Sequence, residues 1–180
     1  MICLAPIAVL DAAYAEDAAG VACVLAEGWT EAAPQAEITR RFAVAPAAYV
    51  PGEFYKRELP LLRSVIDDLG STPAVVVIDG YVWLGADGTR GLGARLFEAL
   101  RSTIPVIGVA KTPYRDDTWS ERVCRGQSRR PLYVTAAGVS NATAAGLISG
   151  MHGDHRMPTL LQRADRLARR ALTECGTQRA

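Results

Sequence analysis

The sequence is poor in the residues that most often bind zinc or form disulfides. It has two histidines and four cysteines in 180 residues. The cysteines are scattered, form no CxxC pair, and have no histidine close by in the chain (Cys3, Cys23, Cys124 and Cys175). This distribution argues against a structural zinc site and against a disulfide framework, and it is typical of reduced cytosolic thiols.

A strong net charge and a long apolar run are also missing. The net charge is +1, with 49% hydrophobic and 22% charged residues, as in an ordinary globular protein. Only a local basic patch could therefore attract nucleic acid or membrane. The apolar start, residues 1–10, is short and has no Lys or Arg before it, which predicts a buried strand rather than a signal peptide or membrane span. We expect one cytoplasmic, monomeric domain over residues 1–180, with no membrane partner.

The chain contains apolar runs that indicate strands and helical periodicities that indicate helices. The first three strands follow one another directly, which favours an antiparallel meander. After a first helix, strands and helices alternate. This order predicts an α/β domain with a mixed sheet. The predicted strands are 7–14, 20–29, 37–44, 74–79, 105–111 and 131–137, and the predicted helices are 52–69, 91–100, 140–151 and 159–172.

Glu58 stands within the apolar stripe of the first predicted helix, among leucines at helical spacing. A buried carboxylate needs compensation, either from an arginine or from a metal ion. Asp11 and Asp79 each end an apolar strand, at the edge where open α/β sheets place their sites. Alone, each fits a turn acid. Together, three converging carboxylates would repel unless a cation such as Mg²⁺ or Mn²⁺ neutralised them.

Further groups extend this candidate site. Lys111 ends another buried strand, so it is either a solvated loop lysine or a group that steadies a phosphate. Tyr81 and Trp83 either pack within their loop or stack on a base. The basic segment 122–131 is either a solvated loop or a phosphate-binding surface.

Five segments resemble, in order, motifs of the endonuclease V family of deoxyinosine-directed nucleases, which has a ribonuclease H-like fold. LDAAY, YVPGEFYKRE and VVVIDGY resemble the segments that carry its three acids, IGVAKT resembles its lysine strand, and HRMPTLLQRADRLAR resembles its C-terminal helix. The matches run from about residue 7 to residue 170. The resemblance implies an antiparallel meander followed by parallel strands, with helices on both faces of the sheet.

The resemblance also assigns roles to residues. It implies that Asp11, Glu58 and Asp79 bind Mg²⁺, for which Mn²⁺ can substitute, and that Lys111 assists catalysis. It implies a wedge that enters the nucleic acid, formed by Tyr49, Val50 and Pro51. It further implies a pocket for a flipped hypoxanthine base, formed by Gly52, Gly80 and Gly108 with Tyr81 beside it.

Some positions depart from the family's pattern. Ala48 replaces the proline that usually precedes the wedge, and the family's histidine, counted back without a gap, falls at Ala137. The loop after Asp79 also lacks a histidine, and the chain begins directly at the first strand. A missing general acid–base group slows a reaction by about 10²–10⁴-fold, so we expect metal-driven cleavage at a reduced rate.

Three functional hypotheses follow. The first is a metal-dependent endonuclease that hydrolyses the phosphodiester on the 3′ side of deaminated purines in DNA or RNA. The second is an inosine-binding or nucleic-acid-binding protein of the same fold with little or no cleavage. The third is a nucleotide-binding enzyme that uses GTRGLG, residues 88–93, as a phosphate loop, although this segment lacks the Lys and Ser/Thr of a P-loop.

Overall fold

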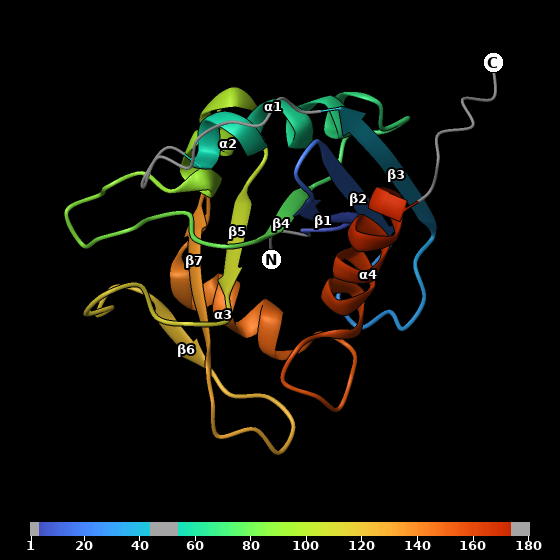
Figure 1. Ribbon diagram of the computed structural model, residues 1–180. Coiled ribbons are helices and arrows are strands. Elements are labelled where there is room, and N and C mark those ends of the chain that lie inside the picture. The colour runs from blue at the N-terminus through green and yellow to red at the C-terminus, as the bar shows by residue number, and fades with distance from the viewer. Residues whose placement is uncertain (1–3, 44–53, 174–180) are drawn as a thin grey trace.

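The computed structural model describes residues 4–43 and 54–173. Within them the chain forms a seven-stranded sheet in the order β3-β2-β1-β4-β5-β7-β6 (Figure 1). Four helices cover this sheet. The strands are β1 (Ile7–Tyr14), β2 (Ala18–Ala26), β3 (Ala36–Ala43), β4 (Val75–Asp79), β5 (Val106–Ala110), β6 (Glu121–Val123) and β7 (Leu132–Ala137), and the helices are α1 (Phe54–Asp67), α2 (Leu92–Ala99), α3 (Asn141–Ser149) and α4 (Thr159–Thr173).

The strand directions confirm the predicted mixed sheet. β1, β2 and β3 form the antiparallel meander, and β1, β4 and β5 run parallel. The parallel part ends there, because β7 runs antiparallel to β5. The sequence did not indicate β6, which is only three residues long and lies in the basic segment, where no apolar run marks a strand.

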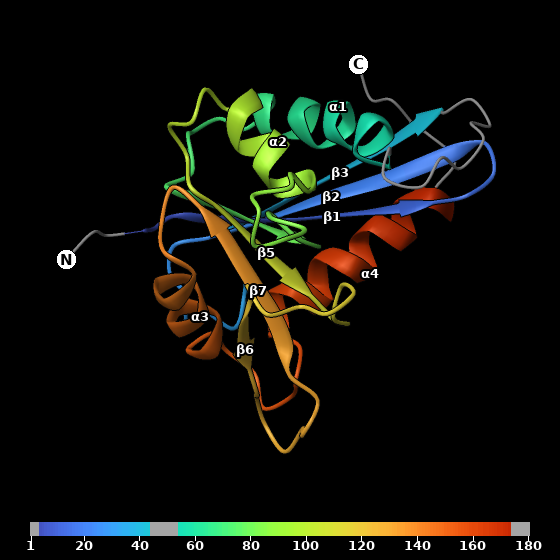
Figure 2. The same ribbon diagram turned by 90° about the vertical axis from the view of Figure 1, so that its left-hand side faces the viewer.

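The helices cover both faces, as predicted. Figure 2 shows α1 and α2 on one side of the sheet and α3 and α4 on the other. The side chains of β1 alternate accordingly, as the pleat of a strand requires. Ile7 and Val9 pack in the core beneath α3 and α4, whereas Ala8 and Leu10 pack beneath α1 and α2. Each central strand therefore reads as a continuous apolar run because both of its faces are buried.

The parallel arrangement of β1, β4 and β5 positions the candidate site. Leu10 pairs with Ile78, and Asp79 pairs with Val109. Asp11 and Asp79, the residues that follow Leu10 and Ile78, therefore lie at one edge of the sheet, with Lys111 just beyond the end of β5. No helix in the described part of the chain is long and apolar enough to cross a bilayer.

Candidate active site

Asp79 and Lys111 form the best-defined contact of the site. The Nζ atom of Lys111 donates a hydrogen bond to Oδ2 of Asp79 at 2.5 Å. Burial disfavours the charge of the ammonium, but the hydrogen bond and the charge of Asp79 outweigh it and raise the pKa of Lys111. Lys111 is thus a paired cation at the site rather than a solvated loop lysine.

Asp11, Asp79 and Lys111 extend from the same face of the sheet. Each stands two residues after a valine that packs beneath α3 and α4, and alternate residues of a strand share a face. These valines are Val9, Val77 and Val109. The site therefore lies at the edge of the face that α4 covers.

Glu58 reaches this site from α1. Its side chain is only 7% exposed, and it makes no hydrogen bond or ion pair with any other described residue. Burial raises the pKa of Glu58 to about 8, and the charges of Asp11 and Asp79 contribute to the increase. The helix thus turns Glu58 toward two further carboxylates, and no arginine among the described residues compensates it.

The pKa of Asp11 is also raised by burial and by neighbouring carboxylates. Burial, together with the charges of Asp79 and Asp165, raises the pKa of Asp11 to about 7. A hydrogen bond from the backbone N–H of Ala12, at 2.8 Å, and the charge of Lys111 only partly offset this increase. Mutual repulsion of this kind is what a bound cation would relieve.

Two charged residues on α4 also belong to the site, and neither was predicted from the sequence. The Asp165 carboxylate interacts electrostatically with Asp11 and Lys111, and Arg169 interacts with Asp11 and Asp79. Arg169 also donates two hydrogen bonds to Asp165, at 3.0 and 3.1 Å. A signal was present: Asp165 is the only acid in α4 and directly follows the buried Ala164.

The residues fit a divalent cation in chemistry but do not form a closed ligand group. Among residues 4–43 and 54–173, no three His, Cys, Asp or Glu side chains are arranged to hold a metal ion. The donors are nevertheless the hard carboxylate oxygens that Mg²⁺ and Mn²⁺ prefer. Glu58 in addition is buried without a cationic partner in the described structure. Binding would require these side chains to close around the ion, with Lys111 releasing part of its hold on Asp79.

The residues predicted to bind a base differ in their surroundings. Gly80 has a φ of +129°, which favours glycine, and a Cβ built there would meet no atom within 4 Å. Gly108 lies instead beneath the backbone of residues 80–82, and a Cβ would approach the Gly80 carbonyl oxygen at 2.5 Å. Gly80 therefore borders open space, whereas Gly108 allows two segments to pack closely. Tyr49, Val50, Pro51 and Gly52 lie outside the described residues.

Tyr81 is a structural link rather than an open stacking surface. It is buried, and its hydroxyl donates a hydrogen bond to Oδ2 of Asp117 at 2.8 Å. The same hydroxyl accepts one from the backbone N–H of Tyr114 at 3.1 Å. Ser120 donates two further hydrogen bonds to Asp117. Tyr81 thereby joins the loop after β4 to the loop after β5.

The predicted position of the family's histidine was wrong. Ala137 is buried in the core beneath α1 and α2 and pairs with Val106, at the start of β5. Lys111 follows the opposite end of that strand. The prediction failed because β7 runs antiparallel to β5, which carries its last residue away from the carboxylates. A histidine at position 137 would therefore not lie beside Asp79.

The basic segment 122–131 divides into two parts. The Arg125 guanidinium is buried and donates hydrogen bonds to the carbonyl oxygens of Met151, Gly153 and His155, so it cannot contact a phosphate. The other arginines of this segment are exposed (Arg122, Arg129 and Arg130), although Arg122 also contacts the Asp117 carbonyl oxygen and the Tyr133 ring.

The structure disfavours the phosphate-loop hypothesis. Gly91 and Gly93 are buried, and their backbone N–H groups donate to the carbonyl oxygens of Val82 and Tyr81. The amides that a phosphate would need are therefore already engaged, and the glycines instead let α2 pack closely on the preceding loop.

The sheet and the carboxylates at the ends of its central parallel strands define an α/β protein of ribonuclease H-like type. A sequence model of the Endonuclease V family matches residues 3–133, and the chain belongs to this family. It is 33% identical over 147 residues to endonuclease V of Streptomyces avermitilis, an alignment that spans 70% of this chain and 62% of that relative. It is 30% identical over 192 residues to endonuclease V of Streptomyces coelicolor, spanning 93% and 79% of the two chains.

Solved structures agree in fold. The crystal structure of the Streptomyces avermitilis endonuclease V superposes with a TM-score of 0.78 at 28% identity, over 94% of this chain and 82% of that one. Human ENDOV gives 0.77 at 22% identity, over 94% and 85%. The Ciona intestinalis endonuclease V, solved with a 24mer DNA containing an inosine followed by a ribo-adenosine, gives 0.69 at 19% identity, over 93% and 85%.

Proposed function

We propose that this protein is a metal-dependent endonuclease that hydrolyses the phosphodiester on the 3′ side of inosine in DNA or RNA. The observation that carries the proposal is the buried Glu58, which faces Asp11 and Asp79 without a cationic partner among the described residues. Membership of the endonuclease V family and the inosine-containing DNA bound by the Ciona relative support the substrate.

The surroundings of each charged side chain at the site suit it to a particular role in this hydrolysis. Asp11 and Asp79 would hold the cation at the strand ends, and Lys111, already paired with Asp79, would donate a hydrogen bond to the phosphate oxygen that gains charge. Glu58, whose pKa is raised, accepts a proton from the attacking water. Asp165 is a fourth carboxylate within reach of this charge cluster, and Arg169 orients it.

The fitting cofactor is Mg²⁺, with Mn²⁺ as a substitute. When bound, such an ion supplies positive charge that polarises a phosphate oxygen and makes a water more acidic. The acids that the described residues bring to this place offer oxygen ligands, and hard divalent cations select oxygen donors.

The decisive experiment incubates the protein with 5′-labelled oligonucleotides that contain one inosine, single-stranded and double-stranded, in DNA and in RNA. We expect a product cut on the 3′ side of inosine in the presence of Mg²⁺ or Mn²⁺, and none with EDTA. Asp79→Asn should reduce the rate by at least about 10²-fold, because it removes a charge from the site.

Asp68→Asn is the matched control, because Asp68 is exposed and lies beyond the far end of α1. It should cleave at the rate of the unmodified protein. Tight binding of the inosine oligonucleotides with no product in either metal would overturn the nuclease assignment and identify a binding protein of the same fold.

A further inference from the structure

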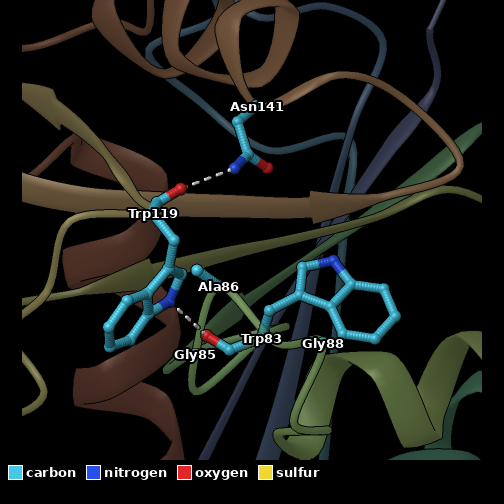
Figure 3. Close-up of a pocket in the computed structure, with 6 residues that line it drawn as sticks. All are labelled: Trp83, Gly85, Ala86, Gly88, Trp119 and Asn141. Atoms are coloured by element: carbon cyan, nitrogen blue, oxygen red, sulfur yellow. Dashed lines mark hydrogen bonds between the residues drawn. The ribbon is translucent and has the colours of Figure 1, made fainter.

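A pocket of about 290 Å³ lies between the loop after β4 and the loop after β5. Trp83 and Trp119 provide its aromatic surfaces, and small residues of the first loop leave it open (Gly85, Ala86 and Gly88). Figure 3 shows the two indoles extending in different directions from the hydrogen bond that joins their residues. Both tryptophans are only half-buried.

The polar atoms around this pocket are already bonded to the protein. Nε1 of Trp119 donates to the Trp83 carbonyl oxygen at 2.9 Å, and Nε1 of Trp83 donates to the Ala136 carbonyl oxygen at 2.8 Å. Asn141 accepts a hydrogen bond from the backbone N–H of Ala136 and donates one to the Trp119 carbonyl oxygen (Figure 3). The indoles are thus fixed by their edges. Trp83 also packs against the core beneath α1 and α2, and Trp119 contacts the Tyr114 ring, so a ligand would meet the exposed part of each half-buried ring.

The pocket is separate from the carboxylate site but close to it. Trp83, which lines it, donates a hydrogen bond from Nε1 to the Ala136 carbonyl oxygen. Ala136 pairs with Ile107, and Ile107 pairs with Val77, two residues before Asp79. Two residues along a strand and two strand spacings across the sheet place Ala136, where the Trp83 ring is anchored, on the order of 12 Å from Asp79. A strand bound at the carboxylates spans this distance within a few nucleotides.

From these observations we propose that the Trp83–Trp119 pocket binds an unpaired nucleobase by stacking, next to the nucleotide at the cleavage site. The proposal rests on the nuclease function above and adds a second contact to the same strand. Aromatic faces accept any base, because every base has a π-face. With the indole N–H groups engaged by the protein, this subsite would contribute affinity rather than base identity.

A nucleobase can come from a nucleic acid strand or from a free nucleotide, and fluorescence separates the two sources. The chain has three tryptophans, and Trp29 packs against the opposite core with its Nε1 bonded to the Leu4 carbonyl oxygen. In a Trp29→Phe protein, fluorescence reports only Trp83 and Trp119. We expect quenching by an inosine oligonucleotide at far lower concentration than by inosine monophosphate. Quenching by the monophosphate at equal or lower concentration would overturn the strand assignment.

Affinity measurements test the role of each ring. Trp119→Leu and Trp83→Leu should weaken oligonucleotide binding by about 5- to 150-fold, the loss of one stacked base. Trp119→Phe should lose less, because it keeps an aromatic face. Trp29→Leu is the matched control and should leave affinity unchanged. Far-UV circular dichroism and thermal melts would show that each variant folds.

The bound base is located with oligonucleotides that each lack one base near inosine. One nucleotide of the strand places its base in the pocket. Removing that base should weaken binding when Trp119 is intact, but should weaken it little further in Trp119→Leu. If every position shows the same loss in both proteins, the proposal is overturned.

All binding is measured in the Asp79→Asn background, so the result does not depend on cleavage. Cleavage is measured separately, with Asp79 intact. If the protein does not cleave but Trp119→Leu weakens binding, the stacking proposal holds and the nuclease proposal fails. If the protein cleaves but Trp119→Leu leaves binding unchanged, the nuclease proposal holds and the stacking proposal fails.

Discussion

At the scale of single residues, Glu58 is the most informative position. A carboxylate on an apolar helix face needs either an arginine or a cation, and the described structure places no arginine against it. Burial and two neighbouring acids raise its pKa from 4.5 to about 8. Without a cation, the folded protein therefore favours the protonated form of Glu58. Its free energy of unfolding falls as pH rises from about 4.5 to about 8, because the unfolded chain then releases this proton and the folded protein retains it.

Glu58→Gln tests this directly, because the amide keeps the shape and removes the ionisation. Without metal, the variant should be as stable as the unmodified protein near pH 4.5. At pH 8.5 it should be more stable, by about 1.4 kcal/mol for each unit by which the native pKa is raised. Cleavage should fall by about 10²–10⁴-fold with the loss of the proton acceptor. Urea unfolding at several pH values and rate assays provide the measurements.

Glu98→Gln is the control for that substitution, since Glu98 is an exposed acid of α2 paired with Arg90. It should change neither the pH dependence of stability nor the cleavage rate. Identical pH profiles for Glu58→Gln and the unmodified protein would show that Glu58 ionises freely and is not held at a charged site.

At the scale of elements, the packing of α4 on the sheet brings its charged residues to the site. Gly20 in β2 allows this close approach, because a Cβ there would lie 2.1 Å from the Ala168 carbonyl oxygen. α4 carries Asp165 four residues before Arg169, so a displaced helix would move both. The prediction of strand 20–29 already contained this glycine, but only the packed helix shows why a side chain is excluded.

Gly20→Ala should therefore destabilise the protein by about 1–3 kcal/mol, as overpacking does in a tight core. It should also slow cleavage, because α4 would shift away from Asp11. Gly146→Ala in α3 is the matched control. That position has no atom within 4 Å of a built Cβ, so the substitution should stabilise the helix by about 0.5–1 kcal/mol. Thermal melts of the two variants should shift in opposite directions, and a melt of Gly20→Ala equal to that of the unmodified protein would contradict the packing argument.

At the scale of the whole molecule, folding gathers acids from three distant parts of the chain into one charged site. The folded protein holds Asp11, Glu58 and Asp79 near one another at a cost in electrostatic repulsion, and the pKa values of Asp11 and Glu58 rise to about 7 and about 8. A cation that binds only the folded state would relieve this repulsion and thereby raise the free energy of unfolding.

Mg²⁺ should therefore raise the melting temperature more at pH 8.5 than at pH 6. At pH 6 both raised carboxyls are mostly protonated, and the ion must displace their protons. At pH 8.5 they are ionised and repel one another until the ion binds. Differential scanning fluorimetry with and without Mg²⁺ measures the shift, and Asp79→Asn should reduce it at both pH values. An equal or larger shift at pH 6 would contradict a cation site beside these carboxylates.

Much of the architecture was predictable because local pattern and tertiary environment agree. The unbroken apolar runs around Val9, Val77 and Val109 indicated central strands, and the helical stripes indicated helices that cover them. Strand β6 escaped because three residues in a basic segment leave no pattern. The candidate site was predictable where acids interrupt apolar runs, as at Asp11, Glu58 and Asp79. Asp165 was not predicted, because an acid among arginines on a helix resembles an ordinary solvated charge, although it is the only acid in α4.

The sequence by itself determined the helices, the strands other than β6, their order and the acids that end the central strands, because those follow from hydrophobic periodicity along the chain. Only the tertiary structure decided which of these groups meet. The antiparallel return of β7 carries Ala137 away from the carboxylates, and the packing of α4 brings Asp165 toward them. The same loops bury Tyr81 and leave Trp83 and Trp119 half-buried, because hydrogen bonds between distant segments fix where each ring points.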